Sequence, residues 1–288
     1  MKIAILITAY HKPDQLIHLI KCLGSKIRYS DIYMHFDLKS DVDDSWLRTL
    51  SDLGVNVLHL FRVYWGGFNQ LKSIVSLIEM ALNKDKYDYL ILISGQDVPI
   101  KPYRELVAYL SENNGKSFID SNKFPVGGWN YRQGFGRVHW FWFLDHIHYR
   151  GVHRLQRVSH HIFDKFSIVK SAAKGLDFYG GSDWWMLPGE VAGLCLSEFK
   201  SNKKLVSCFR HSFIPSEMFF QTVINNSKFQ ATIVNNNKRY ILWREGSGHP
   251  ECLTRGEIDH ALKGDCFFAR KLDIDLDPVL FYETLSIF

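Results

Sequence analysis

The sequence lacks any run of about 18 consecutive apolar residues, and its first residues turn polar too soon for a secretion signal. Its five cysteines are scattered and never occur as Cys-x-x-Cys, so neither a disulfide framework nor a zinc knuckle is predicted. These absences favour a reducing compartment. We therefore expect a cytoplasmic protein, and peripheral contact with the inner face of a membrane is left open.

Two common phosphate-binding signatures are also absent. No Gly-x-Gly-x-x-Gly follows the first predicted strand, and no Gly-x-x-x-x-Gly-Lys-Ser/Thr occurs anywhere. The first absence disfavours a dehydrogenase-like enzyme, and the second disfavours a P-loop protein. The chain also has no long Lys/Arg run and no motif that reads RNA or DNA, so no nucleic-acid partner is predicted.

Apolar and aromatic residues, in contrast, are plentiful. The 288 residues are 46% hydrophobic and 15% aromatic, which is ample for a large core and for ring faces that stack on sugars or uracil. The formal net charge of +5 is mildly basic and favours phosphorylated ligands or an anionic membrane surface.

Buried strands and amphipathic helices alternate through the first part of the chain. The predicted elements are strands at residues 3–8, 31–36, 55–60 and 89–94, and helices at residues 15–23 and 69–82. This alternation predicts an α/β fold with a mostly parallel central sheet flanked by helices. Ligands of such sheets bind beyond the carboxyl ends of the strands, where Thr8, Asp37 and Asp97 stand.

Periodicity weakens between residues 117 and 177, and we expect this segment to be an insertion that walls the site. Beyond it, the predicted elements are strands at residues 184–187 and 267–272, and helices at residues 189–199, 216–225 and 254–262. We expect a single domain over residues 1–288. Residues 1–116 would form the nucleotide-binding half, and residues 117–288 the acceptor-binding and catalytic half.

Two carboxylates in the second half stand among residues that bury or stack. Asp183 lies in Gly180-Gly181-Ser182-Asp183-Trp184-Trp185, and Glu217 lies in Phe213-Ile214-Pro215-Ser216-Glu217-Met218-Phe219-Phe220-Gln221. One carboxylate can hold sugar hydroxyls while another removes a proton. The pattern indicates a sugar transferase, and a non-catalytic carbohydrate-binding protein is the alternative from another class.

With these two stretches, seven pieces of the chain resemble, in collinear order, the family of core-2/I-branching β-1,6-N-acetylglucosaminyltransferases and peptide O-xylosyltransferases, including its short bacterial members. The other pieces are Ile7-Thr8-Ala9-Tyr10-His11-Lys12, Ile32 to Ser40, Tyr64-Trp65-Gly66-Gly67, Leu92 to Ile100 and Phe267 to Asp273. The resemblance implies a GT-A-like fold, a UDP-sugar donor, inversion at the anomeric carbon and independence from a metal ion.

The resemblance makes Glu217 the candidate general base, although a carboxylate in the first turn of a helix would look the same in sequence. It makes Arg270 and Lys271 the candidates for neutralising the departing diphosphate, against the alternative of a solvated pair at a strand end. A second basic partner is needed. Arg244, His249 and Arg239 are the choices for it, and Arg244 is the one we predict.

Asp37 is expected to receive the uracil or ribose, with Thr8 and Ala9 beside it, whereas Asp97 is either a donor ligand or a turn residue. Asp183 is expected to bind sugar hydroxyls, and its neighbours in the motif complete the sugar-binding group: Ser182, Trp184 and Trp185.

Metal binding is the alternative for Asp183, but no second carboxylate follows it two residues on. Asp41-Val42-Asp43 lies in a polar loop, and Asp273-Ile274-Asp275-Leu276-Asp277 follows the basic pair near the chain end. Several histidines have no regular ligand spacing and are expected to line a polar cleft or face solvent: His146, His148, His153, His160 and His161. No metal site and no cofactor are predicted.

The donor is expected to be UDP-GlcNAc on family grounds, followed by UDP-xylose, because residues 180–184 are closer to the xylosyltransferase branch, and then by another UDP-hexose. The acceptor would be a hydroxyl of a glycan or lipid-linked oligosaccharide, as in the synthesis of bacterial surface polysaccharide.

Overall fold

The computed structural model describes residues 1–145, 152–165, 170, 173, 175–244 and 246–288. His146 and His148 lie outside the described residues. The helices are α1 (Pro13–Gly24), α2 (Asp44–Asp52), α3 (Phe68–Lys84), α4 (Tyr103–Glu112), α5 (Asn130–Gln133), α6 (Phe135–His139), α7 (Val152–Lys165), α8 (Gly189–Ser201), α9 (Lys203–Arg210), α10 (Phe219–Asn225), α11 (Arg255–Lys263) and α12 (Pro278–Leu285).

The central sheet of the described chain has seven strands in the order β10-β6-β9-β4-β1-β2-β3. Their bounds are β1 (Ile3–Ala9), β2 (Ile32–Phe36), β3 (Asn56–Leu58), β4 (Tyr89–Ser94), β6 (Ser117–Ile119), β9 (Trp185–Pro188) and β10 (Ile233–Val234). All neighbours are parallel except at β9, which runs antiparallel to β4 and β6. The predicted α/β fold with a mostly parallel sheet flanked by helices is confirmed.

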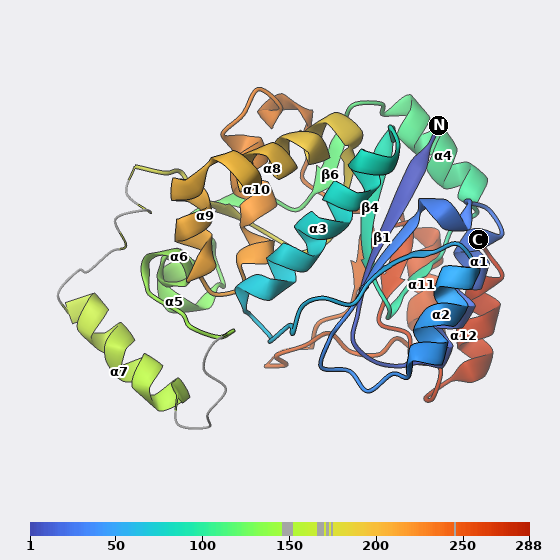
Figure 1. The fold of residues 1–288 in the computed structure, drawn as a ribbon, viewed down its shortest axis with the longest axis horizontal. Coiled ribbons are helices and arrows are strands. Elements are labelled where there is room, and N and C mark those ends of the chain that lie inside the picture. Colours follow the sequence, from blue (N-terminus) through green and yellow to red (C-terminus); the bar gives the residue numbers. More distant parts are fainter. Residues whose placement is uncertain (146–151, 166–169, 171–172, 174, 245) are drawn as a thin grey trace.

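Alternating side chains of the buried strands divide the core into two layers. Ile5 of β1 and Ile91 of β4 face a cluster that includes the apolar side of α1 and α12, whereas Leu6 and Leu92 face a cluster formed with α3, α8 and α10. Figure 1 shows α3 and α8 lying over one face of the sheet. Because both faces of the sheet are covered, its strands read as continuous apolar runs.

Two smaller sheets complete the described fold. The strands β5 (Asp97–Pro99), β11 (Arg239–Ile241) and β12 (Phe268–Arg270) form one in the order β11-β12-β5, and β7 (Asn122–Lys123) pairs with β8 (Tyr179–Gly180) in the other. The antiparallel pairing of β12 with β5 sets Arg270 opposite Asp97. The Arg-Lys pair near the chain end is thereby brought beside the end of β4.

One predicted helix differs in an informative way. The helix expected at residues 216–225 is divided into a 3₁₀ turn (Pro215–Glu217) and α10, because Met218 between them has φ −135°. Outside the insertion, the missed helices α2, α4, α9 and α12 have only eight to ten residues each, so each spans too few turns to establish a clear helical period. None of the described helices is both long and apolar enough to cross a bilayer.

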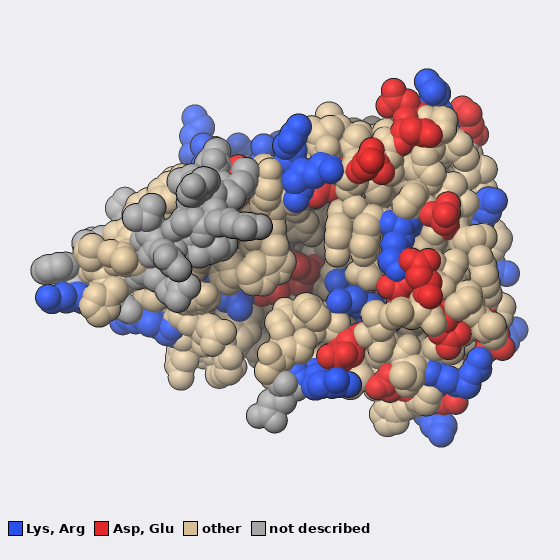
Figure 2. Space-filling view, turned by 90° about the horizontal axis from the view of Figure 1, so that it is seen from below, with Lys and Arg blue, Asp and Glu red and all other residues tan. Residues whose placement is uncertain are grey.

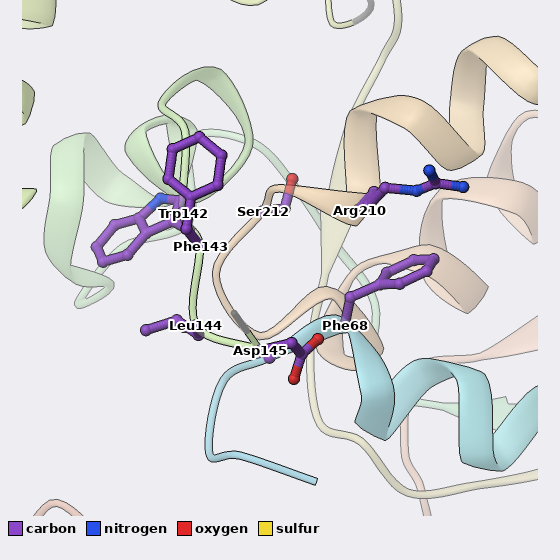
Figure 3. Close-up of a pocket in the computed structure, with 8 residues that line it drawn as sticks. Phe68, Trp142, Phe143, Leu144, Asp145, Arg210 and Ser212 are labelled. Carbon is purple, nitrogen blue, oxygen red and sulfur yellow. The ribbon is translucent and has the colours of Figure 1, made fainter. Parts of the chain in front are cut away.

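The predicted insertion carries α5, α6 and α7, which lie at the end of the molecule away from both termini (Figure 1). Its Asp145 side chain accepts a hydrogen bond of 2.8 Å from the backbone N–H of Asn69 and so caps the start of α3. Figure 3 shows Asp145 beside this helix end, at a hollow of about 10 Å³ that is too small for a ligand. A Cβ at Gly67 would overlap the Asp145 carboxylate, so glycine is needed there.

We predict that Trp185→Ala destabilises the protein by about 3–5 kcal/mol, because it would empty a large volume in the core. Trp185 has no exposed surface and packs against Phe220 at a ring-centroid distance of 5.2 Å. Unfolding in urea measures the change. Trp243→Ala is the matched control: this tryptophan is 58% exposed, and its removal should change stability by no more than about 0.5 kcal/mol. Equal effects of the two substitutions would contradict the assignment of Trp185 to the core.

Candidate active site

A cleft of about 930 Å³ opens at the carboxyl ends of the parallel strands. Thr8 and Ala9 reach it from β1, and Asp37 reaches it from the end of β2. In Figure 2 the face turned to the viewer is hollowed near its middle, with acidic atoms deep in the hollow and basic atoms beside it. The site therefore lies where the strand order of an open α/β sheet places it.

The reversed direction of β9 brings the Gly-Gly-Ser-Asp-Trp motif to this same edge. Residues that precede an antiparallel strand lie level with residues that follow its parallel neighbours, so Asp183 meets the ends of β4 and β6. The backbone N–H of Gly181 donates to the carbonyl oxygen of Glu217 at 2.9 Å, and Gln221 Nε2 donates to the carbonyl oxygen of Ser182 at 2.8 Å. The two motif stretches thus form one rigid unit.

Glu217 is presented by a strained turn. Ile214 has φ 49°, in the left-handed region that β-branched residues avoid, and its N–H is held by the carbonyl oxygen of Gly66 at 2.8 Å. Pro215 then begins the 3₁₀ turn that ends at Glu217. Ile214 and Glu217 both line the cleft. The strained turn therefore directs the Glu217 carboxylate into it.

Burial is the main cause of the raised pKa of both Glu217 and Asp183. Burial first, and then the charge of Asp183, raises the pKa of Glu217 to about 7, although Arg137 opposes the shift with a hydrogen bond of 2.7 Å from Nη1 to Oε2. Burial also raises the pKa of Asp183, against Ser216 and the cations Arg270 and Arg137. A carboxylate with a pKa near neutral pH is suited to taking a proton from an acceptor hydroxyl.

Cations line the same cleft as the two carboxylates. Arg270 and Lys271 both line it, and Arg270 donates to the hydroxyl of Ser94 at the end of β4. Burial and the neighbouring Arg270 lower the pKa of Lys271, and its Nζ makes no hydrogen bond or ion pair with any described residue. This ammonium is available to an anionic ligand.

Asp97 was a candidate donor ligand, but it does not line the cleft and supports other residues instead. It has no exposed surface, its Oδ1 lies 2.6 Å from Arg239 Nε, and its Oδ2 lies 3.4 Å from Arg270 Nη1. A buried carboxylate between two guanidinium groups holds both in place. Asp97 therefore positions the cations and does not bind the donor directly.

Arg244 and Trp185 were also predicted to bind ligands, and neither lines the cleft. The side chain of Arg244 is 76% exposed, and the residue is not among those that line the cleft, whereas Arg239 and His249, the alternatives for the second basic partner, do line it. Trp185 is a core residue of β9 because the strand alternation points it away from the site. Neither residue offers a contact to a ligand in the cleft.

Ser182, Asp183 and Trp184 line the cleft. Trp184 is only 8% exposed, and the guanidinium carbons of Arg270 and Arg239 lie 4.7 Å and 5.0 Å from its ring centroid. Its ring supports these cations and leaves little free face for a sugar. Three aromatic residues of the cleft are exposed and offer more ring surface: Tyr10, Trp65 and Trp243.

Asp37 lies at the end of β2 with its Oδ1 held by the N–H groups of Lys39 and Val63 at 2.9 Å and 3.2 Å. His35 lies two residues earlier on the same face of the strand and also lines the cleft. Its Nε2 accepts from the N–H of Phe61 at 3.2 Å, and burial lowers its pKa to about 4. The sequence analysis missed this neutral imidazole at the expected nucleotide end of the cleft.

The candidate metal ligands in the described part of the chain do not form a cluster. In the described part of the chain, no three or more His, Cys, Asp or Glu side chains converge. Asp273 and Asp275 of the C-terminal Asp-x-Asp pattern both pair with the ammonium of Lys12. His160 is buried against Trp142 with ring centroids 4.2 Å apart, and His161 faces solvent.

Several residues of the site were missed because they come from segments without a readable period. Arg137 and Trp129 belong to the insertion, and Asp120 directly follows the three-residue strand β6. Asp120 accepts hydrogen bonds from the backbone N–H and the side-chain amide of Asn237. Asn236 and Asn237 also line the cleft, and no signal in the sequence pointed to that place.

An α/β domain whose strand-end cleft sets carboxylates against cations has the layout of a glycosyltransferase. The sequence model of the core-2/I-branching enzymes matches residues 25–262, and the chain belongs to this family of glycosyltransferases. The sheet is accordingly that of a GT-A-like nucleotide-sugar transferase domain.

Similar curated proteins include xylosyltransferase sqv-6 of Caenorhabditis elegans, 25% identical over 284 residues that cover 88% of this chain and 33% of that protein. Xylosyltransferase 2 of Homo sapiens is 26% identical over 240 residues, covering 81% of this chain and 25% of that protein. The chain thus spans a third or less of the length of these relatives.

Among solved structures, S. aureus TarS is similar with a TM-score of 0.31 and 14% identity, covering 46% of this chain and 23% of that chain. A cytidylyltransferase from Leptospira borgpetersenii has a TM-score of 0.32 and 14% identity, covering 68% of this chain and 64% of that chain. Likenesses this weak carry no argument about function.

We predict that Gly181→Ala disturbs the site, because a Cβ there would overlap the backbone carbonyl oxygen of Asp120. The loop that carries Asp183 would have to move, at a cost of about 1–3 kcal/mol. Thermal unfolding and UDP binding measure the effect. Gly256→Ala is the control: Gly256 lies in α11, and the new Cβ would meet no atom within 4 Å beyond its chain neighbours and its own helix backbone. This variant should unfold no earlier than the parent. Parent-like unfolding of Gly181→Ala would contradict the predicted overlap.

Proposed function

We propose that the protein is an inverting glycosyltransferase that moves a sugar from a UDP donor to a hydroxyl of a glycan acceptor without a metal ion. The observation that carries the proposal is the arrangement of Glu217, with its pKa raised to about 7, in one cleft with Arg270 and Lys271. A base and a set of phosphate-binding cations are the two functions that such a transfer needs.

In the proposed reaction, Glu217 takes the proton of the acceptor hydroxyl while that oxygen forms a bond to the anomeric carbon. The bond from this carbon to the UDP oxygen breaks on the opposite face, so the configuration inverts. Arg270 and Lys271 neutralise the charge that develops on the diphosphate, and Asp97 keeps Arg270 in place. Fixed cations in this position support a reaction that does not require a metal ion.

The donor is assigned by class. The relatives compared above are named xylosyltransferases, which makes UDP-xylose the first sugar to test, ahead of the UDP-GlcNAc expected from the sequence. Asp183 and Ser182 would bind hydroxyls of the sugar, and Asp37 with Thr8 and Ala9 would hold the uridine. A lipid-linked or surface-polysaccharide precursor as acceptor, a cytoplasmic location and contact with a membrane face remain parts of this proposal.

Glu217→Gln should lower the rate of UDP release by roughly 100-fold or more, because the amide cannot accept the proton. The substitution is nearly isosteric, so UDP should raise the melting temperature of the variant and of the parent protein by the same amount. Steady-state turnover and thermal shift are the two measurements. Full turnover in the variant would remove Glu217 from its role, and UDP binding without turnover in the parent would favour the non-catalytic alternative.

A panel of UDP-sugars in EDTA should show UDP release with at least one donor, at a rate that added Mn²⁺ or Mg²⁺ leaves unchanged within about twofold. The reason is that, in the proposed reaction, Arg270 and Lys271 neutralise the leaving group in place of a metal ion. The measurement is the rate of UDP release with and without Mn²⁺ or Mg²⁺. Activity that appears only after a divalent ion is added would contradict metal independence and leave the role of Glu217 in place.

A further inference from the structure

We propose that Arg137 is a positioning residue for the base: it holds one oxygen of the Glu217 carboxylate in place and keeps that carboxylate ionised. The inference rests on the proposed function, because it assumes that Glu217 accepts the proton. It extends that function to the insertion, which was expected only to wall the site.

The contact is direct and partly shielded from water. Arg137 Nη1 donates to Glu217 Oε2 at 2.7 Å, and the two side chains are 12% and 25% exposed. Glu217 Oε1 accepts no hydrogen bond from any residue in the described ranges. A charge-assisted bond to one oxygen limits rotation of the carboxylate and leaves the other oxygen for the acceptor hydroxyl.

The guanidinium of Arg137 is itself held on a rigid aromatic surface. Its central carbon lies 3.8 Å from the ring centroid of Trp129 and 5.7 Å from that of Phe213. The carbonyl oxygen of Arg137 accepts from the N–H of Phe213 at 2.9 Å, which ties α6 to the segment just before the Glu217 turn. The arginine and the base are therefore held by the same packing unit.

A merely structural arginine would satisfy its donors within the fold. Arg137 Nε is buried and has no hydrogen-bond partner among the described residues, so the side chain carries an unpaired polar group while it reaches Glu217. A buried donor without a partner is destabilising, so the fold alone does not account for this arginine. The hydrogen bond from Arg137 to Glu217 gives the side chain a role in the site.

The charges around Glu217 give the arginine a second effect. Asp183, from the loop before β9, disfavours the ionised form, and Arg137, from α6, is the cation that favours it; Arg270 of β12 acts on Asp183. Loss of Arg137 would leave two carboxyl groups side by side in a partly dry site, so the pKa of Glu217 would rise further. A protonated Glu217 cannot accept a proton, and activity would then require a higher pH.

The test is the pH profile of kcat/KM for UDP release by the whole protein with a donor that the parent uses, or for donor hydrolysis if no acceptor is known. In the parent, activity should fall as pH drops below about 7. In Arg137→Met this fall should move to higher pH by at least about one unit, which reduces activity at pH 6 by about tenfold and restores it partly at pH 9. Arg137→Lys keeps the charge, so its fall should stay near that of the parent even where turnover is reduced.

Arg104→Met is the matched control. This arginine is exposed on α4, remote from the cleft residues, and its loss should leave both the profile and the rate unchanged. A UDP-induced thermal shift in each variant shows that the donor site is still folded. If Arg137→Met does not fold, Arg137→Lys and Arg137→Gln provide the same comparison of kept and lost charge.

The outcomes separate this inference from the proposed function. If Glu217→Gln abolishes turnover while Arg137→Met lowers the rate with an unshifted profile, Arg137 serves packing alone and the positioning role is wrong. If Glu217→Gln keeps turnover, the assignment of the base fails and the inference fails with it. A shifted profile in Arg137→Met and a parent-like profile in Arg137→Lys would support both.

Discussion

The site depends on the single strand that runs against its neighbours. Because β9 is antiparallel to β4 and β6, the residues before it reach the edge where the parallel strands end. The hydrogen bond from Gly181 N–H to the carbonyl oxygen of Glu217 then joins this loop to the turn that carries the base. Without that reversal, Asp183 would lie at the far edge of the sheet, and Glu217 would face the cleft without it.

The charged groups in and beside the cleft are held in place by ion pairs with buried or partly buried partners. Asp97 has no exposed surface and holds Arg239 and Arg270 on one side. A fully buried carboxylate would be very unfavourable unpaired, so the two arginines stabilise it while it orients them. Elsewhere in the cleft, Arg137 pairs with Glu217 and holds one oxygen of its carboxylate.

The sheet and the two carboxylate motifs could be predicted from the sequence, because strands buried on both faces leave long apolar runs and the motifs are contiguous. Arg137 could not be predicted in the same way, since its partner is 80 residues away and the helix that carries it is only five residues long. Asp97 and Trp185 were misjudged for a related reason. Whether a side chain faces a cleft or the core depends on strand direction and pairing, which no local pattern records.

Near-neutral titration of Glu217 follows from a balance that the insertion controls. Burial and Asp183 favour the protonated form, and Arg137 favours the ionised form. A base with a pKa near the working pH combines sufficient ionisation with sufficient basicity, so neither a fully exposed glutamate nor one buried without the arginine would serve as well. The segment with the least regular sequence pattern therefore supplies the charge on which the proposed chemistry depends.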